Sequence, residues 1–403
     1  MSGAGGRLMV YSQDGLGLGH LRRTSTIAGA VSAAVPGLAV LLVADSPAVG
    51  FFGAVRDLDH LKLPSITKVR PGDWRPVSLP VGFGDVQLLR LELLRTAVLG
   101  FRPDLLLVDH MPHGAMGELV PALETLRAAG GRTRVVLGLR DILDAPRVVR
   151  RRWRAEGAMD ALVRHYDRVL VYGRREVFDV AERYGFPAAV TARLHYTGYL
   201  CASSSTALSS SRRGRDGRAQ IVAMVGGGAD GYELLRTVLE ALPAVDAVRP
   251  CTATLLTGPF MPRASRQDLE RRARGLPARV RGSVRDLPPL VAAADVAVAM
   301  AGYNSSVEVL ATGTPAVLVP RAGPSAEQRT RARLFAERGW VRTVEPERLD
   351  GATLAAAVLD CLAAGPGAAP AGPPDLGGLP VVVEHLRSLL GERTSLPAVG
   401  PRR

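Results

Sequence analysis

Polar side chains in the first segment of this sequence are spaced for proton transfer next to a bound ligand. The run Gly15-Leu16-Gly17-Leu18-Gly19-His20 directly follows a short apolar segment. Glycines allow a tight turn that approaches a ligand, and an imidazole titrates near neutral pH, as a general base requires. We predict that His20 is a catalytic base and that Gly17 and Gly19 lie beside its substrate. A structural histidine that caps the turn is the alternative.

A second polar group follows two further apolar runs. Asp109, His110 and His113 come at the end of one run, and Arg140 and Asp141 end another. One aspartate and two histidines can bind a metal, but no fourth ligand lies nearby in the sequence. The pattern favours a loop that lines a substrate site, with Asp109 able to orient a histidine and the Arg-Asp pair at the same rim.

Three successive glycines suggest a diphosphate site in the second half of the chain. Gly226, Gly227 and Gly228 follow the apolar run Ile221–Val225. Such a turn leaves backbone amides bare for an anion. A tight strand-to-helix turn is the alternative, although three glycines exceed what it needs.

The segment from Ala301 to Glu308 is the most specific signal. Asn304 and Ser305 are expected at a helix N-terminus, where side chains and free N–H groups receive phosphate. Glu308 lies one turn later on the same helix face, and a carboxylate there can accept both hydroxyls of a ribose. Glu327 and Gln328 open another predicted helix and suit sugar hydroxyls. N-capping plus a solvated glutamate is the alternative.

Short apolar runs that alternate with helical patterns must position these groups. Such alternation predicts parallel sheets covered on both faces. The predicted strands of the first half are Leu8–Tyr11, Leu38–Ala44, Leu105–Val108, Arg134–Leu139 and Val169–Tyr172, with helices over Val86–Leu99 and Met116–Ala129. Those of the second half are Ile221–Val225, Thr252–Thr257, Ala278–Val280, Val296–Met300 and Ala316–Val319, with helices from Tyr232 and over Ser305–Ala311, Ala326–Arg338 and Ala352–Leu362.

The fold class predicted from this pattern is α/β, with two Rossmann-like, doubly wound parallel-sheet domains in tandem. We expect the first domain over residues 1–202, a polar linker over 203–218, the second domain over 219–380, and a C-terminal helix and tail over 381–403. In such folds ligands bind at the carboxyl ends of the strands. With two domains, the predicted site is the cleft that they face.

Composition narrows the class of protein. The 403 residues include 51 Lys and Arg against 38 Asp and Glu, a formal net charge of +13. The arginines are spread along the chain and aromatic residues make up only 5%, so nucleic-acid binding is disfavoured. The composition is typical of GC-rich coding and predicts an actinobacterial source.

Cysteine usage and hydropathy indicate the compartment. Cys201, Cys251 and Cys361 are far apart, which disfavours a disulfide framework and favours a reducing cytoplasm. The most apolar region, 287–301, is broken by Asp295 and is shorter than a bilayer span. We predict a soluble cytoplasmic protein and leave open a peripheral contact with the anionic inner face of the membrane.

The motifs resemble a known group of enzymes. Val284 to Gln328 resembles the donor-binding half of GT-B glycosyltransferases, and Gly302-Tyr303-Asn304-Ser305-x-x-Glu308 resembles the nucleotide-sugar signature of UDP-glycosyltransferases. The runs Ser283 to Leu287, Ala294 to Val296 and Gly302 to Glu308 are similar to the family of the lipid II-forming N-acetylglucosaminyl transferase. The opening Tyr11 to Arg23 is similar to a bacterial group of predicted glycosyltransferases.

The resemblance implies a role for each matched residue. Glu308 would hold the ribose, and the backbone near Val284 would meet the base. The diphosphate would be held by Asn304, Ser305 and the Gly227-Gly228 turn, after Gly302. The donor sugar would contact Glu327 and Gln328, while His20 would sit at the reacting centre on the acceptor side.

Two departures from the family patterns refine this expectation. Plant-type enzymes carry a histidine where Met300 stands, so one phosphate contact must come from elsewhere, such as an arginine. The histidine of the lipid II family is followed by a proline that is absent after His20, which argues against a lipid-linked muramyl acceptor. The spacing of glutamates also bears on the stereochemistry of transfer. Retaining enzymes of this fold usually pair two glutamates eight positions apart, whereas Met300 and Ala316 stand at that distance from Glu308, which favours an inverting enzyme.

The predicted function is therefore metal-independent, inverting transfer of a sugar, GlcNAc or a related hexose, from a UDP-sugar to a hydroxyl or amine acceptor. His20 or an acid such as Asp14 would take the acceptor proton. No metal or other cofactor is expected, and the acceptor belongs to natural-product or cell-envelope chemistry. A UDP-sugar 2-epimerase or hydrolase of the same fold, and a non-catalytic nucleotide-sugar-binding protein, are the alternatives.

Overall fold

Each half of the chain builds its own parallel sheet. The computed structural model describes residues 6–13, 19–46, 58–70, 73–130, 132–201, 217–284, 287–365 and 374–391. These form two units, which we call unit 1 (the described residues of 1–141, 146–200 and 377–403) and unit 2 (142–145 and 201–376). Asp14, Gly17 and most of the predicted linker, 203–216, lie outside the described residues. The prediction of two parallel-sheet α/β units is confirmed.

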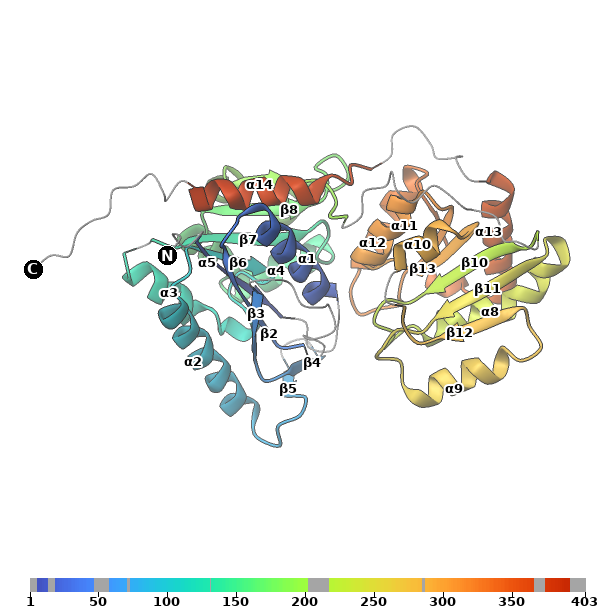
Figure 1. Ribbon diagram of the computed structural model, residues 1–403, viewed down its shortest axis with the longest axis horizontal. Helices are drawn as coiled ribbons and strands as arrows, with labels where there is room; N and C mark the ends of the chain where they lie inside the picture. The colour runs from blue at the N-terminus through green and yellow to red at the C-terminus, as the bar shows by residue number, and fades with distance from the viewer. Residues whose placement is uncertain are drawn as a thin grey trace, which may run out of the picture. The chain divides into compact units, whose positions relative to one another are not determined.

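Unit 1 is built on a seven-stranded sheet in the order β3-β2-β1-β6-β7-β8-β9 (Figure 1). Every neighbouring pair runs parallel. The strands are β1 (Arg7–Ser12), β2 (Ala39–Ala44), β3 (Leu58–Lys62), β6 (Leu105–Asp109), β7 (Arg134–Arg140), β8 (Arg168–Tyr172) and β9 (Leu194–Tyr196). An antiparallel hairpin of β4 (Ile66–Arg70) and β5 (Asp73–Pro76) leads into α2.

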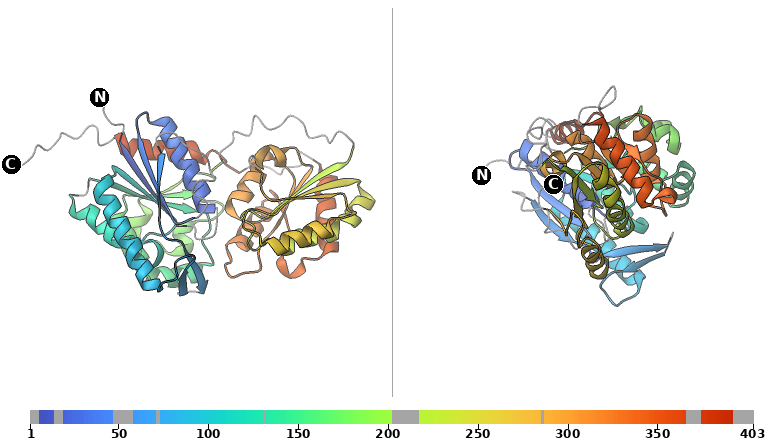
Figure 2. Two further views of the ribbon diagram at one scale, coloured as in Figure 1. Left: turned by 60° about the horizontal axis from the view of Figure 1, so that its bottom comes forward. Right: turned by 90° about the vertical axis from the view of Figure 1, so that its right-hand side faces the viewer.

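The helices of unit 1 include two that pack on each other from opposite ends of the chain, α1 and α14 (Figure 2). The α-helices described in unit 1 are α1 (Gly19–Ala34), α2 (Phe83–Phe101), α3 (Val120–Ala128), α4 (Pro146–Ala155), α5 (Ala158–His165), α6 (Val180–Tyr184), α7 (Ala188–Thr191) and α14 (Gly378–Gly391). The helix expected over 116–129 begins only at Val120. Met116 and Gly117 have φ values of 53° and 81°, so the chain cannot continue a right-handed helix through them.

Unit 2 is built on a six-stranded parallel sheet in the order β12-β11-β10-β13-β14-β15. Its strands are β10 (Ala219–Met224), β11 (Cys251–Leu256), β12 (Ala278–Arg281), β13 (Val296–Met300), β14 (Ala316–Val319) and β15 (Arg342–Thr343). Its helices are α8 (Tyr232–Val248), α9 (Arg263–Arg272), α10 (Leu287–Ala292), α11 (Tyr303–Thr312), α12 (Glu327–Glu337) and α13 (Gly351–Ala364).

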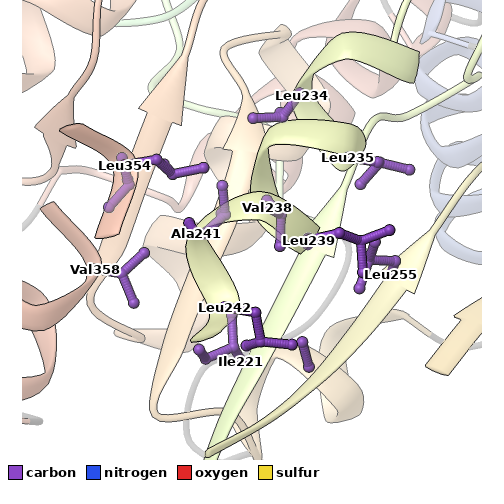
Figure 3. Packing of buried hydrophobic residues seen from close by; sticks show 14 of the residues in the cluster. Ile221, Leu234, Leu235, Val238, Leu239, Ala241, Leu242, Leu255, Leu354 and Val358 are labelled. Carbon is purple, nitrogen blue, oxygen red and sulfur yellow. The ribbon is translucent and has the colours of Figure 1, made fainter. Parts of the chain in front are cut away.

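The core of unit 2 follows from the spacing of apolar residues on α8. Leu234, Leu235, Val238, Leu239 and Leu242 recur at helical intervals and are all at most 4% exposed. They face Ile221 of β10 and Leu255 of β11, while Leu354 and Val358 of α13 close the other side (Figure 3). This packing fixes the sheet whose carboxyl edge carries the glycine turn.

The C-terminal helix, expected over Val381–Leu390, belongs to unit 1. Gly377 forms a β-bridge with Leu200, and the next residue passes so close to Gly198 that a Cβ on Gly378 would lie 2.5 Å from its carbonyl oxygen. On α14, His385 Nδ1 lies 3.0 Å from Arg168 Nη1 of β8. Unit 2 therefore ends at Leu376, four residues before the predicted boundary.

Candidate active site

The candidate base of unit 1 lies where α1 begins. His20 is the second residue of α1, which follows β1, and Asp109 is the last residue of β6. Because β1 and β6 are parallel neighbours, the start of α1 and the end of β6 meet at the carboxyl edge of the sheet. His20 Nδ1 lies 2.5 Å from Asp109 Oδ2, so the two predicted residues, 89 positions apart, are brought together.

Arg23 completes this group, although sequence reasoning gave it no role. Its Nε and Nη2 donate to Asp109 Oδ1 at 3.1 and 2.9 Å, and Nη2 also reaches Oδ2 at 2.8 Å. Burial alone would raise the pKa of the Asp109 carboxyl, but the charges and hydrogen bonds of Arg23 and His20 outweigh it and lower that pKa. The signal for Arg23 was its position three residues after His20, on the same helix face.

The contacts of His20 Nδ1 orient its ring. Asp109 Oδ2 lies 2.5 Å and Arg23 Nη2 lies 2.8 Å from this nitrogen. In the tautomer that carries a proton on Nδ1, this N–H donates a hydrogen bond to the carboxylate and Nε2 is the basic nitrogen of the ring. The His20 side chain keeps 16% of its surface exposed, whereas Asp109 keeps 1%. We call His20, Arg23, Asp109 and His110 the histidine site.

His110 stands next to His20 in a strained conformation. Its φ is 73°, in the left-handed region that non-glycine residues rarely adopt, and the two ring centroids are 5.1 Å apart. Burial and the positive charge of Arg140, the last residue of β7, hold the pKa of the His110 imidazole well below its usual value. Its buried Nδ1 has no hydrogen-bond partner among the residues described, so the neutral ring can bond to a ligand.

Hydrogen bonds from other elements fix the loop that carries these histidines. Tyr166, the residue that follows α5, donates a hydrogen bond from its hydroxyl to Pro112 O at 2.6 Å. Tyr11 of β1 donates to Glu118 at 2.6 Å, and Arg90 of α2 holds the same carboxylate through two bonds of 2.6 Å. All four of these side chains are at most 1% exposed. The loop therefore has a rigid attachment to the sheet and to α2.

Two other predicted residues of this edge have partners away from His20. His113 Nε2 lies 3.3 Å from Glu156, just after α4, and its Nδ1 is buried without a partner. Asp141 is 2% exposed and packs against Gly173. A Cβ added to Gly173 would lie 2.8 Å from the Cβ of Asp141.

In unit 2 the three glycines differ in role. Gly228 has φ 93°, and a Cβ there would lie 1.9 Å from Thr257 O, so packing alone requires a glycine. Its N–H donates to Val225 O at 3.2 Å and is used within the turn. The N–H groups of Gly226 and Gly227, by contrast, donate to no other group in the described part of the chain. The free donors are thus the first two glycines of the turn.

The start of α11 faces this turn. β10 and β13 are parallel neighbours, so the glycine turn and the first residues of α11 lie at the same sheet edge. A Cβ on Gly226 would lie 3.8 Å from Ser305 Oγ. The N-cap, Gly302, offers no side chain, and the N–H of Ser305 has no partner among the described residues. Uncapped N–H groups and the helix dipole make this edge attractive to an anion.

Two of the other residues predicted to bind the donor lie on α11, and one follows β12. Asn304 is in the first turn of α11, and Glu308 is half-buried one turn later on the same face. Val284 is half-buried three residues after β12. We call Gly226, Gly227, Asn304, Ser305 and Glu308 the glycine-turn site.

Glu327 has a structural partner four residues along the same helix, a spacing that the sequence could have indicated. It begins α12, but it is 3% exposed and its carboxylate accepts from Arg331 Nη1 at 2.9 Å. Arg331, itself fully buried, also donates to Ala301 O at 2.8 Å and lies over the ring of Tyr303. The pair thus anchors the segment that opens α11. Gln328 is half-buried and accepts from the Arg321 N–H at 3.1 Å.

No group of three or more His, Cys, Asp or Glu side chains that could hold a metal occurs in the ranges that the structure describes. Asp109, which could have been a ligand with His110 and His113, has both oxygens bonded to Arg23. No helix in the described ranges is both long and apolar enough to cross a bilayer.

Comparison with known proteins agrees with this architecture. The model of the glycosyltransferase family 28 C-terminal domain matches residues 222–371. A curated relative from Exiguobacterium sp., a UDP-N-acetylglucosamine–N-acetylmuramyl-(pentapeptide) pyrophosphoryl-undecaprenol N-acetylglucosamine transferase, is 28% identical over 147 residues, which are 35% of this chain and 39% of that protein. The matched part thus spans about two fifths of the relative's length.

Solved structures match nearly the whole chain at low identity. The glycotransferase of kitacinnamycin is 20% identical with a TM-score of 0.57, over 95% of each chain. A putative UDP-N-acetylglucosamine 2-epimerase from Listeria monocytogenes is 11% identical with a TM-score of 0.63, over 98% of this chain and 99% of its own.

The two parallel-sheet units have the GT-B fold of the solved glycosyltransferase structures. Within the chain, residues 222–371 match the glycosyltransferase family 28 C-terminal domain.

Proposed function

We propose that the chain is a glycosyltransferase that moves a sugar from a UDP-sugar donor to an acceptor hydroxyl or amine by inverting displacement without a metal. The glycine-turn site is the main support for this proposal. Three backbone N–H groups that have no partner in the described ranges, on Gly226, Gly227 and Ser305, lie at one sheet edge next to a helix N-terminus. Such an edge suits a diphosphate, and Glu308 follows at the distance of one turn for a ribose.

The donor sugar is assigned to Gln328. Its Oε1 is used by the backbone of Arg321, so its amide N–H groups remain as donors to sugar hydroxyls. Glu327 positions Arg331 and the start of α11, and we give it no direct sugar contact. The choice of GlcNAc or a related hexose, and of uracil as the base near Val284, follows the curated relative.

The histidine site supplies the chemistry on the acceptor. The acceptor O–H or N–H proton passes to His20 Nε2 as the acceptor atom bonds to the anomeric carbon of the sugar. The bond from that carbon to the diphosphate breaks with its electron pair, and UDP departs. Asp109 stabilises the imidazolium, and Arg23 keeps Asp109 ionised. Asp14 is the alternative base. Partial charges at the start of α11 stabilise the departing diphosphate.

The first test is calorimetric titration of the full chain with UDP, dTDP, GDP and NAD, with and without EDTA. We expect UDP to bind, NAD not to bind, and EDTA to leave both UDP affinity and transfer unchanged, since helix and glycine N–H groups replace a metal. Binding that EDTA abolishes contradicts the metal-independent mechanism. Absence of binding to every nucleoside diphosphate contradicts the transferase proposal.

A UDP-sugar 2-epimerase is the second candidate, because the Listeria putative epimerase has the same fold over nearly the full chain. Incubation with UDP-GlcNAc and no acceptor separates the two. Conversion of the sugar to its 2-epimer supports the epimerase, whereas a donor that is consumed only when acceptors are added supports the transferase.

We also propose that unit 1 contacts an anionic membrane surface. Exposed apolar side chains gather between β5 and the first turns of α2; they are Val77, Leu79, Val81, Leu88 and Leu89, each 39–61% exposed. The net charge of +13 adds attraction to anionic lipid. Such a contact would place the protein, otherwise soluble, at the cytoplasmic face of the membrane.

Vesicle sedimentation tests this contact. Vesicles rich in phosphatidylglycerol should retain the wild type, and the double variant Leu88→Gln/Leu89→Gln should bind several-fold less, because apolar surface is lost at unchanged charge. Leu99→Gln, 52% exposed near the other end of α2, is the matched control. Equal binding of all three proteins contradicts the assigned surface.

A further inference from the structure

Arg321 reaches across the edge of the sheet that carries the glycine-turn site. It lies two residues past the end of β14, while Asp230 lies in the turn after β10. Strands are spaced about 4.8 Å apart, and β13 separates β10 from β14. Arg321 Nη1 nevertheless lies 3.4 Å from Asp230 Oδ2. The side chain therefore spans the position where β13 ends and α11 begins.

We propose that Arg321 binds the diphosphate of the donor and that Asp230 holds its guanidinium when the site is empty. The inference rests on the proposed function and adds the cationic phosphate ligand of the same site. The glycine and helix N–H groups provide only partial charges, so a full positive charge completes the site for a diphosphate.

The contacts of Arg321 suit a side chain that exchanges partners. Its pair with Asp230 is long, and the two side chains are 32% and 52% exposed, so the pair is weak. Its Nε is buried and has no hydrogen-bond partner within the part of the chain that the structure describes. Its backbone N–H is fixed by Gln328 Oε1 at 3.1 Å, so the base of the side chain stays in place while the guanidinium moves. A phosphate oxygen can satisfy both the free Nε and the nitrogen that leaves Asp230.

Titration of Arg321→Met with UDP, UMP and inorganic pyrophosphate tests the assignment. We expect UDP and pyrophosphate to bind about 10- to 100-fold more weakly, since a charged hydrogen bond is lost, and UMP to lose much less. Arg321→Lys, which keeps the charge without the planar fork, should be intermediate. Arg274→Met is the control: this exposed arginine lies before β12 begins, at the opposite edge of the sheet.

We expect Asp230→Asn to strengthen UDP binding, which is opposite to the effect of Arg321→Met. Removing the competing carboxylate frees Arg321, so UDP should bind a few-fold more tightly, and the gain should vanish in the double variant with Arg321→Met. If the wild type binds UDP and Arg321→Met binds it equally well, or loses UDP and UMP to the same extent with unchanged thermal unfolding, the Arg321 assignment is overturned while the proposed function stands. A wild type that binds neither UDP nor pyrophosphate overturns both.

Discussion

Replacing His20 with alanine is expected to lower kcat by about 10²–10⁴-fold while UDP affinity stays within about twofold. We assign the acceptance of the acceptor proton to this imidazole, whose Nδ1 lies 2.5 Å from Asp109 Oδ2. His20 is not among the residues that we assign to the donor, all of which belong to unit 2. Transfer kinetics with UDP-GlcNAc, beside calorimetry with UDP, separate the two effects.

The histidine prediction has a matched control and a defined failure. His165, a half-buried histidine on α5 outside the histidine site, should tolerate alanine with little change in rate. His20→Gln keeps a donor for Asp109 without a basic nitrogen and should be as inactive as His20→Ala. If His20→Ala transfers at the wild-type rate, another base such as Asp14 carries the reaction.

The lowered pKa of Asp109 gives this site a pH signature. Its carboxylate stays ionised to below its ordinary value of about 3.9. Its contribution to folding is therefore present above that value and is lost as the pH falls through its lower folded-state pKa. A loss of the transfer rate that begins above pH 5 would therefore report a group other than Asp109.

Replacing Glu308 with alanine should weaken UDP binding by about 10²–10³-fold, because two charge-assisted hydrogen bonds to the ribose hydroxyls are lost. The discriminating measurement compares UDP with 2′-deoxy-UDP. The wild type should prefer UDP, and Glu308→Ala should bind both equally, since the carboxylate that reads the 2′-hydroxyl is gone.

Structural damage would give a different pattern from a lost ribose contact. Glu337→Ala, on the exposed side of α12, removes the same charge from the same unit and should leave UDP affinity unchanged. An unchanged preference for UDP over its 2′-deoxy form in Glu308→Ala, at an unchanged melting temperature, removes the ribose assignment.

Local patterns predicted most of the elements that carry the site. Apolar runs bounded by glycine or proline placed both core sheets, and β13 and β14 have the predicted bounds. Several short or polar strands were not predicted, among them β3, β9 and β15. Their burial comes from neighbouring strands rather than from their own composition, so no local pattern marks them.

The sequence by itself determined the fold class, the glycine turn, the start of α11 and the placement of His20 after β1, because each depends on residues a few positions apart. Only the tertiary structure decided which polar groups meet. Asp109 joins His20 from 89 positions away, and Arg321 reaches Asp230 across 91. The pair of Glu327 with Arg331 is local instead, four positions apart on α12, and the structure adds that both side chains are buried. The distant partners depend on strand order, which no short stretch of sequence encodes.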